Sequence, residues 1–189
     1  MTTRCSWCGN DPLYVNYHDT EWGVPIYDDK ALWAKLILDG AQAGLSWITI
    51  LRKRENYYAA FGGLDPEKVV YYDEAKVAEL LQNSGIIRNK LKINSAIKNA
   101  RGYLQITEEY GSFSTFVWDF VDGKPVQNAW QTMADVPAET ETSKEVSKAL
   151  KKYGFSFVGP TIVYAWMQAV GMVNDHVMDC FRYGEVGGG

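Results

Sequence analysis

Cysteine and histidine, two side chains that bind transition metals, gather near the two ends of this 189-residue chain. Cys5, Cys8 and His18 lie near the N-terminus, and His176 and Cys180 lie near the C-terminus. The last two are spaced i, i+4, so a helix would place both on one face. Two cysteines and two histidines form a closed tetrahedral zinc site, which is structural because no position is left for water. We therefore predict a structural zinc ion held by Cys5, His18, His176 and Cys180. Cys8 replaces one ligand or stays a free thiol, and buried thiols without metal are the alternative.

Aromatic side chains and one isolated acid form a second group of candidates. The sequence contains 7 Trp and 12 Tyr, more than core packing alone explains. Asp39 lies in an apolar, glycine-rich segment shortly before Trp47. A carboxylate in such surroundings is either a functional acid or a helix-terminal group that accepts hydrogen bonds from backbone N–H groups.

Residues 144–171 have the pattern of two helices joined by a tight turn. Thr142 and Glu145 have the spacing of a capping box, Gly154 is expected to end the first helix, and Gly159-Pro160 is expected to begin the second. Glycine at the turn allows close approach of a ligand, and the free N–H groups of a helix start attract phosphate. The hairpin is therefore a candidate phosphate-binding element, with packing alone as the alternative.

Three short basic clusters, at 52–54, 88–92 and 148–152, each lie beside an expected turn or helix end. If they converge on one side, they form a surface for phosphates; otherwise they are solvated helix faces. The net charge of −4 argues against a large sequence-independent nucleic-acid surface, although it allows a local basic patch.

The elements that must position these residues are helical. Apolar residues recur at helical spacing, and no run alternates with the period of two that marks a strand. The predicted fold class is all-α, with a polar loop at 122–142 and a short helix from Asp65. The other helices are expected at about 29–40, 47–61, 73–85, 93–104, 113–121, 144–153 and 160–171.

With 47% apolar residues the chain has enough material for an ample core. We expect one unit over residues 1–183 and a flexible tail at 184–189. Three cysteines do not make a disulfide framework, and the first residues lack the apolar run of a signal peptide. No stretch approaches the roughly 18 consecutive apolar residues of a membrane span. These features predict a cytoplasmic protein.

Many ordered strings of this chain resemble one enzyme family. They include Asp11-Pro-Leu-Tyr14, Tyr17-His-Asp19, Glu21-Trp-Gly23, Gln42-Ala-Gly-Leu-Ser-Trp-Ile48, Tyr153-Gly-Phe, Phe157-Val-Gly159 and Val173-Asn-Asp-His176. Together they resemble the DNA-3-methyladenine glycosylase I family of the helix-hairpin-helix DNA glycosylase superfamily. The resemblance covers about Arg4 to Cys180.

The resemblance implies a base-excision repair enzyme that flips N3-alkylated adenine out of alkylated double-stranded DNA and releases free 3-methyladenine. It also implies the structural zinc site with the four ligands given above. Asp39 matches the catalytic acid. The implied base pocket consists of Trp7, Tyr14, Tyr17, Trp22 and Trp47. The implied DNA contacts are Gly44, Leu45, Phe157, Val158 and Gly159, with Leu45 filling the gap left by the flipped base.

The resemblance also bears on mechanism. Matching on His176 places Asn174 where most superfamily members have a catalytic Asp, and Thr161 falls near the nucleophilic Lys of lyase-competent members. We therefore expect a monofunctional enzyme, acting as a monomer. The family usually has Glu in place of Asp39, and one methylene fewer retracts the carboxylate by about 1.5 Å. This departure predicts a backbone shift, a bridging water or looser base selectivity.

Two other functions are compatible with some of these features. A non-catalytic helix-hairpin-helix DNA-binding module would keep the hairpin and the basic clusters, and its DNA affinity would survive mutation of Trp47. A small-molecule binder would use the aromatic residues alone, and its affinity would lack the salt dependence of phosphate contacts.

Overall fold

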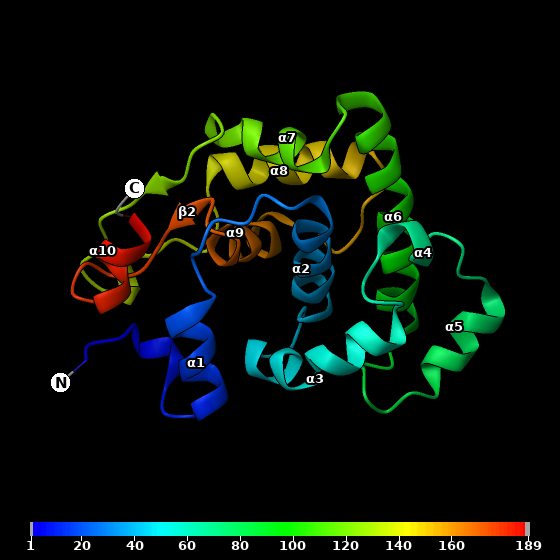
Figure 1. Ribbon diagram of the computed structural model, residues 1–189, viewed down its shortest axis with the longest axis horizontal. Coiled ribbons are helices and arrows are strands. Elements are labelled where there is room, and N and C mark those ends of the chain that lie inside the picture. The colour runs from blue at the N-terminus through cyan, green and yellow to red at the C-terminus, as the bar shows by residue number, and fades with distance from the viewer. Residues whose placement is uncertain (1, 188–189) are drawn as a thin grey trace.

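The computed structural model describes residues 2–187 and is mostly helical, which confirms the predicted fold class (Figure 1). Its α-helices are α1 (Pro12–Thr20), α2 (Asp29–Ala41), α3 (Trp47–Ala60), α4 (Pro66–Val69), α5 (Glu74–Leu81), α6 (Lys90–Tyr110), α7 (Phe113–Trp118), α8 (Glu141–Lys152), α9 (Pro160–Ala169) and α10 (Phe181–Gly187). Short 3-10 helices lie at η1 (Ser6–Cys8), η2 (Asp119–Val121) and η3 (Met133–Asp135). The helices expected from the sequence are present, with ends that differ by a few residues.

A small parallel sheet departs from the all-helical prediction. Strand β1 (Val126–Gln127) pairs with β2 (Val173–Asn174), so the segment predicted as a loop is tied to the chain that precedes His176. Two residues per strand are too few for a period of two to appear in the sequence.

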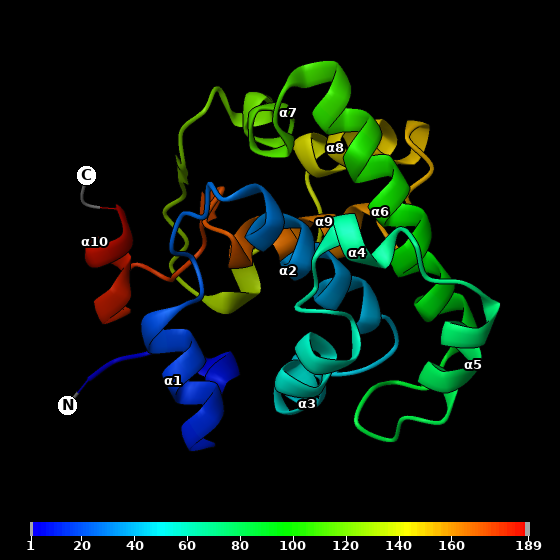
Figure 2. The ribbon, with the colours of Figure 1, turned by 45° about the vertical axis from the view of Figure 1, so that its right-hand side comes forward.

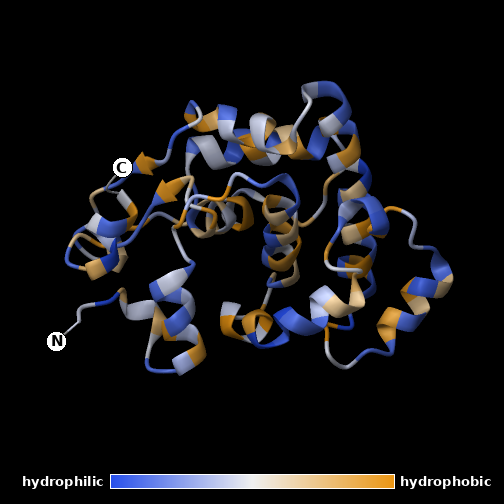
Figure 3. Ribbon diagram, in the orientation of Figure 1, coloured by the Kyte–Doolittle hydropathy of each residue, from blue (hydrophilic) through white to orange (hydrophobic). Residues whose placement is uncertain are grey.

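Helices α2 and α9 form the centre of the core. Helix α2 packs against α9, α6 and α7, and α8 packs against α9. Two fully buried tryptophans lock this arrangement: Trp33 Nε1 donates to the Asn99 carbonyl at 3.2 Å, and Trp166 Nε1 donates to the Leu32 carbonyl at 3.0 Å. Figure 3 shows hydrophobic residues along both helices in the middle of the molecule. The core therefore holds α2, which carries Asp39, in a fixed position.

Acidic and hydroxyl side chains start most helices. Asp11 accepts from the Leu13 N–H at the start of α1, and Asp28 accepts from the Ala31 N–H at the start of α2. Helix α8 begins earlier than predicted, because Thr140 and Ser143 form the capping box in place of the pair expected at 142 and 145. The usual capping-box pattern has Glu or Gln at the third helical position, so the sequence did not indicate Ser143. Its hydroxyl nevertheless accepts a hydrogen bond from the Thr140 N–H, as a Glu carboxylate would.

The predicted hairpin is formed by α8, residues 153–159 and α9. Asn99 on α6 bonds both the N–H and the carbonyl of Ser156, at 2.9 and 3.0 Å, and Ser147 Oγ donates to the Val158 carbonyl at 2.6 Å. Phe157 has a positive φ of 54°, which these bonds hold in place. The hairpin loop is therefore rigidly attached to α6 and α8.

The three basic clusters do not converge on one surface. Figures 1 and 2 place α3, with residues 52–54, and α8, with residues 148–152, at opposite ends of the molecule. Arg54 bonds Glu21 through both guanidinium nitrogens, at 2.6 and 3.0 Å. Lys92 is committed to backbone carbonyls. Most of these basic side chains are therefore solvated or bonded within the protein and do not form one phosphate surface.

The segment at 184–189, expected to be a tail, is described only in part. Residues 184–187 form the end of α10, whereas 188 and 189 lie outside the described residues. Within residues 2–187, none of the helices has the length and apolar character needed to cross a membrane.

Candidate active site and metal cluster

The five aromatic residues implied by the resemblance meet around one cavity of about 230 Å³. Trp7 belongs to η1, Tyr14 and Tyr17 lie one turn apart on α1, Trp22 follows α1, and Trp47 begins α3. All five line the cavity, although they come from three elements and a connecting segment.

The rings support one another in tilted and edge-on arrangements. The Trp7 ring centre is 5.0 Å from those of Tyr14 and Trp22, and the Tyr17 and Trp47 centres are 5.5 Å apart. Aromatic pairs prefer such geometries over face-to-face stacking. The cavity walls are therefore preorganised flat surfaces.

Asp39 lies in the last turn of α2 and lines the same cavity, with 4% of its surface exposed. It does not cap the helix, because its Oδ1 accepts a hydrogen bond from Lys35 Nζ at 2.8 Å. The Lys35 Nζ atom also lies 3.6 Å from the Trp47 ring centre and 5.9 Å from that of Tyr17. Desolvation raises the pKa of Asp39 and lowers the pKa of Lys35, and the attraction within the pair only partly offsets it.

Sequence reasoning missed Lys35, which lines the cavity beside Asp39. The available signal was the i, i+4 pairing of opposite charges inside an apolar helical stripe. It also missed other lining residues that have no distinctive signal, namely Gln42, Met133, Ala165, Gln168 and Ala169.

Three buried polar atoms around the cavity have no hydrogen-bond partner within the described part of the chain. They are Asp39 Oδ2 and the indole Nε1 atoms of Trp7 and Trp47. Buried polar groups are nearly always bonded, and leaving one unpaired costs about 1–3 kcal/mol. One free acceptor and two free donors therefore point to a ligand that has both hydrogen-bond donors and acceptors.

The loop between α2 and α3 presents an apolar side chain beside the cavity elements. Gly44 has a φ of 78°, and the Leu45 side chain is 41% exposed. Lys92 Nζ donates to the carbonyls of Ala41 and Ala43 at 2.8 and 2.6 Å. A basic residue that was a candidate for a phosphate surface thus fixes this loop.

The hairpin residues singled out in the sequence have different surroundings. The Val158 side chain is buried, whereas a Cβ atom added to Gly159 would meet nothing within 4 Å. Gly159 is the N-cap residue of α9, and no side chain caps the N–H groups there. A Cβ at Gly40 would lie 3.2 Å from the Phe157 carbonyl oxygen, so the hairpin packs closely on the helix that carries Asp39.

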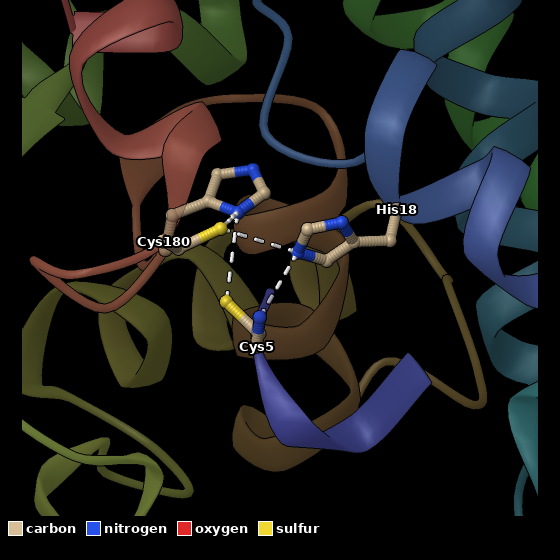
Figure 4. Close-up of side chains that lie close together, drawn as sticks. Cys5, His18 and Cys180 are labelled. Atoms are coloured by element: carbon tan, nitrogen blue, oxygen red, sulfur yellow. Dashed lines mark hydrogen bonds between the residues drawn. The ribbon is translucent and has the colours of Figure 1, made fainter. Parts of the chain in front are cut away.

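The four predicted metal ligands form a buried cluster that joins the two ends of the described chain (Figure 4). Their ligand atoms all lie within 4.8 Å of one another. His176 Nδ1 is 3.6 Å from Cys5 Sγ and 3.5 Å from Cys180 Sγ, and His18 Nε2 is also 3.5 Å from Cys180 Sγ. Figures 1 and 2 both place α1, which carries His18, and α10, which follows Cys180, on the same side of the molecule.

The remaining ring nitrogens have partners that orient the imidazoles. His18 Nδ1 lies 2.7 Å from Asp19 Oδ1, and Asp19 is in turn held by Arg4 at 2.8 Å. His176 Nε2 lies 2.9 Å from the Trp22 carbonyl oxygen. Such outer partners fix the tautomer of metal-binding histidines. His176 Nδ1 and His18 Nε2, the latter accepting a long hydrogen bond of 3.4 Å from the Cys5 N–H, face the sulfur atoms.

The local structure of the C-terminal ligands differs from the prediction. His176 and Cys180 were expected on one face of a helix, but they lie in the non-helical segment between β2 and α10. Asp175, which is fully buried, holds this segment by accepting from Asn128, Trp130, Tyr164 and Gln168. Cys8 lies outside the cluster, and its thiol donates to the Cys5 carbonyl at 3.2 Å.

Comparisons with known proteins agree over nearly the whole chain. The DNA-3-methyladenine glycosylase 1 of Escherichia coli (strain K12) is 52% identical over 180 residues, which is 95% of this chain and 96% of the relative. A crystal structure of a 3-methyladenine DNA glycosylase I has a TM-score of 0.93 at 50% identity, covering 95% of this chain and 98% of that one. A variant of such an enzyme, crystallised in complex with 3-methyladenine, has a TM-score of 0.92 at 40% identity, covering 94% and 96%. Residues 7–183 match the methyladenine glycosylase family, and the chain belongs to that family.

Proposed function

We propose that this protein is a monofunctional DNA glycosylase that hydrolyses the N-glycosidic bond of 3-methyladenine in alkylated double-stranded DNA. The observation that carries the proposal is the cavity of about 230 Å³, in which aromatic rings surround a buried acid with a free oxygen. The named relatives support it, since they are 3-methyladenine DNA glycosylases and one is bound to 3-methyladenine.

The pocket chemistry suits a flipped, N3-methylated adenine. A base inside a duplex cannot reach a buried site, so the nucleotide must rotate out of the helix. The rings of Tyr17 and Trp47 stack on the flat base and attract its positive charge, by roughly 0.5–2 kcal/mol per good contact. The free Oδ2 of Asp39 accepts a hydrogen bond from the exocyclic amine, and the free indole N–H groups donate to ring nitrogens.

Hydrolysis needs little activation, because methylation at N3 makes the base a good leaving group. Water adds to the oxocarbenium-like sugar. Asn174, at the position of the superfamily's catalytic Asp, is fully engaged with Gln127, the Tyr183 carbonyl and the His176 N–H. Thr161, near the position of the lyase nucleophile, donates to Glu139. These contacts support base release without strand cleavage.

Two elements next to the pocket bind the distorted duplex. Leu45, exposed on the loop held by Lys92, fills the gap left by the flipped nucleotide. The uncapped N–H groups at Gly159 bind a backbone phosphate, because a helix start carries partial positive charge. Phe157 and Val158 shape the hairpin that presents them.

The ion in the Cys5, His18, His176 and Cys180 cluster is zinc. Zinc bonds sulfur at about 2.3 Å and nitrogen at about 2.0–2.1 Å, and tetrahedral angles then separate sulfur from nitrogen by about 3.6 Å. The sulfur–nitrogen distances of 3.5–3.6 Å fit that geometry. With four protein ligands the ion has no position for water, so it stabilises the fold and takes no part in hydrolysis.

The decisive experiment is to identify the bases released from N-methylated duplex DNA by the wild-type protein and by Trp47→Ala. We expect the wild type to release 3-methyladenine without strand cleavage and the variant to lose this activity. Trp47→Phe, which keeps an aromatic face, should retain part of the base-release activity. Activity in this variant would show that substitution at position 47 does not by itself prevent folding. Strand cleavage would contradict the monofunctional assignment.

A non-catalytic DNA-binding module is the other candidate, favoured only by the open hairpin at Gly159. Intact duplex binding without release of any base by the wild type would support the module and overturn the glycosylase. We further infer that the enzyme acts as a monomer in the cytoplasm, where the DNA of its bacterial relatives is found.

A further inference from the structure

Lys35 places a positive charge inside the pocket, beside the acid and the rings proposed to hold the base. Its Nζ atom lies 2.8 Å from Asp39 Oδ1 and 3.6 Å from the Trp47 ring centre. The side chains of Lys35 and Asp39 are 12% and 4% exposed, so solvent screens neither charge strongly. A bound base therefore faces a nearly neutral ion pair instead of a free carboxylate.

The surrounding charged groups add little net charge to the Lys35–Asp39 pair. Arg54 and Glu21 form a separate ion pair, with Nη1 and Oε2 2.6 Å apart, and largely cancel each other. Tyr17 stays neutral because burial raises its pKa well above 10. The ammonium group of Lys35 lies over the Trp47 ring, 3.6 Å from its centre.

The position of the ion pair allows Lys35 and a base to be bound together. Lys35 uses Asp39 Oδ1, whereas Oδ2 has no partner within residues 2–187. An exocyclic amine can donate to Oδ2 without breaking the pair. Both residues lie on α2, one turn apart, so the short Asp side chain keeps the pair compact against the helix.

Charge moves away from the base when the lesion is cleaved. In the intact nucleotide the methylated base is cationic. When the C1′–N9 bond breaks, its electron pair stays on N9, the base becomes neutral, and the positive charge passes to the sugar. Water then adds to C1′ and loses a proton. A fixed positive charge beside the base raises the free energy of the intact nucleotide, whose base is cationic, more than that of the cleaved state, whose base is neutral.

From this relationship, which rests on the proposed function, we propose that Lys35 is a charge-controlling residue of the pocket: it destabilises the bound cationic base and so promotes its departure from the sugar. Such an interaction raises kcat, because the penalty is relieved as the transition state forms. The same interaction weakens the binding of the cationic base. Lys35 also shifts the preference of the pocket from cationic towards neutral ligands, against the attraction that the rings exert on a cation.

The first test compares the affinities of the full-length protein for two ligands at neutral pH, by tryptophan fluorescence. Free 3-methyladenine is neutral, whereas in 3,9-dimethyladenine a methyl group replaces the sugar and keeps the base cationic. Lys35→Met removes the charge and keeps the side-chain length; Lys35→Arg keeps the charge. We expect Lys35→Met alone to improve binding of the cation relative to the neutral base by about tenfold. An unchanged ratio would overturn the proposal.

Release of 3-methyladenine from methylated duplex DNA provides a second readout. Lys35→Met should lower kcat by about tenfold and lower KM as well, the signature of lost ground-state destabilisation. Lys98→Met, on the exposed face of α6, is the matched control and should change neither value. An unchanged or faster kcat in Lys35→Met would also overturn the role. Failure of the wild type to release any base would count against the glycosylase assignment only, because the ligand ratio is measured without cleavage.

Discussion

His176 Nε2 lies 2.9 Å from the carbonyl oxygen of Trp22, so a single imidazole connects the metal cluster to the pocket. The Nδ1 atom of the same ring faces the sulfur atoms of Cys5 and Cys180. The Trp22 ring lines the cavity, with its centre 4.7 Å from that of the imidazole. An ion in the cluster would therefore fix the backbone from which a pocket ring projects.

Loss of the metal is expected to weaken both the fold and the pocket. Cys180→Ser should abolish stoichiometric metal binding and lower the free energy of unfolding by more than about 3 kcal/mol, since metal binding is coupled to folding. Affinity for 3-methyladenine should fall as well, because Trp22 loses its anchor. Elemental analysis, urea unfolding and fluorescence titration measure the three effects.

Cys8→Ser is the control for this variant, because Cys8 is equally buried but lies outside the cluster. It should keep its metal. A metal-free Cys8→Ser together with a metal-replete Cys180→Ser would contradict the ligand set.

Leu45→Ala is expected to separate base flipping from base binding. Since Leu45 is 41% exposed, its truncation should change stability by no more than about 0.5 kcal/mol. Release of 3-methyladenine from duplex DNA should drop, while affinity for the free base stays the same. Leu13→Ala, at a residue of equal exposure on α1, should leave both values unaltered. Equal losses in the two variants would rule out a specific role for Leu45.

Two glycine substitutions should distinguish packing of the hairpin from its contact with DNA. A Cβ atom at Gly102 would lie 2.4 Å from the Phe155 ring, so Gly102→Ala should destabilise the fold by about 1–3 kcal/mol. Gly159→Ala meets no protein atom and should cost little stability. If the backbone at Gly159 approaches a phosphate, only this variant should lose DNA affinity while remaining folded. Undiminished duplex binding by Gly159→Ala would argue against that approach.

The pH dependence of kcat should have an alkaline limb set by Lys35. Burial lowers the pKa of Lys35 below its usual value of 10.5, with Asp39 and Glu21 opposing the shift and Arg54 adding to it. Lys35 is charged below its pKa and loses the charge as pH rises through it, so kcat should fall at a lower pH than for an exposed lysine. In Lys35→Arg the limb should move to higher pH. An identical limb in that variant would assign the titration to another group.

The parts of this molecule that could be predicted from sequence are those with a local pattern. Helical periodicity locates the core helices. Residue types alone indicated a metal site at the two ends of the chain but left Cys8 open as a ligand, and the family resemblance implied the set Cys5, His18, His176 and Cys180. The five aromatic residues were found through ordered motifs of a known family. Their meeting around one cavity agrees with those motifs, although their role remains a proposal.

The parts that could not be predicted depend on tertiary contacts. Asp39 could be singled out as unusual, but the sequence does not show that Lys35 points inward with it; only packing of α2 against its neighbours decides that. Lys92 belongs to a cluster that was a candidate either for a phosphate surface or for a solvated helix face, and it bonds the carbonyls of Ala41 and Ala43 instead. Both cases involve long, flexible side chains, whose direction is set by the nearest unpaired polar group.

The sequence separation within the metal cluster has a consequence for biosynthesis. Cys5 and His176 are 171 positions apart, so a ribosome completes the ligand set only when almost the entire described chain has been made. A translation product that stops before His176 leaves Cys5 and His18 without the other two ligands. A metal ion held by all four residues would thus mark molecules that extend at least to Cys180.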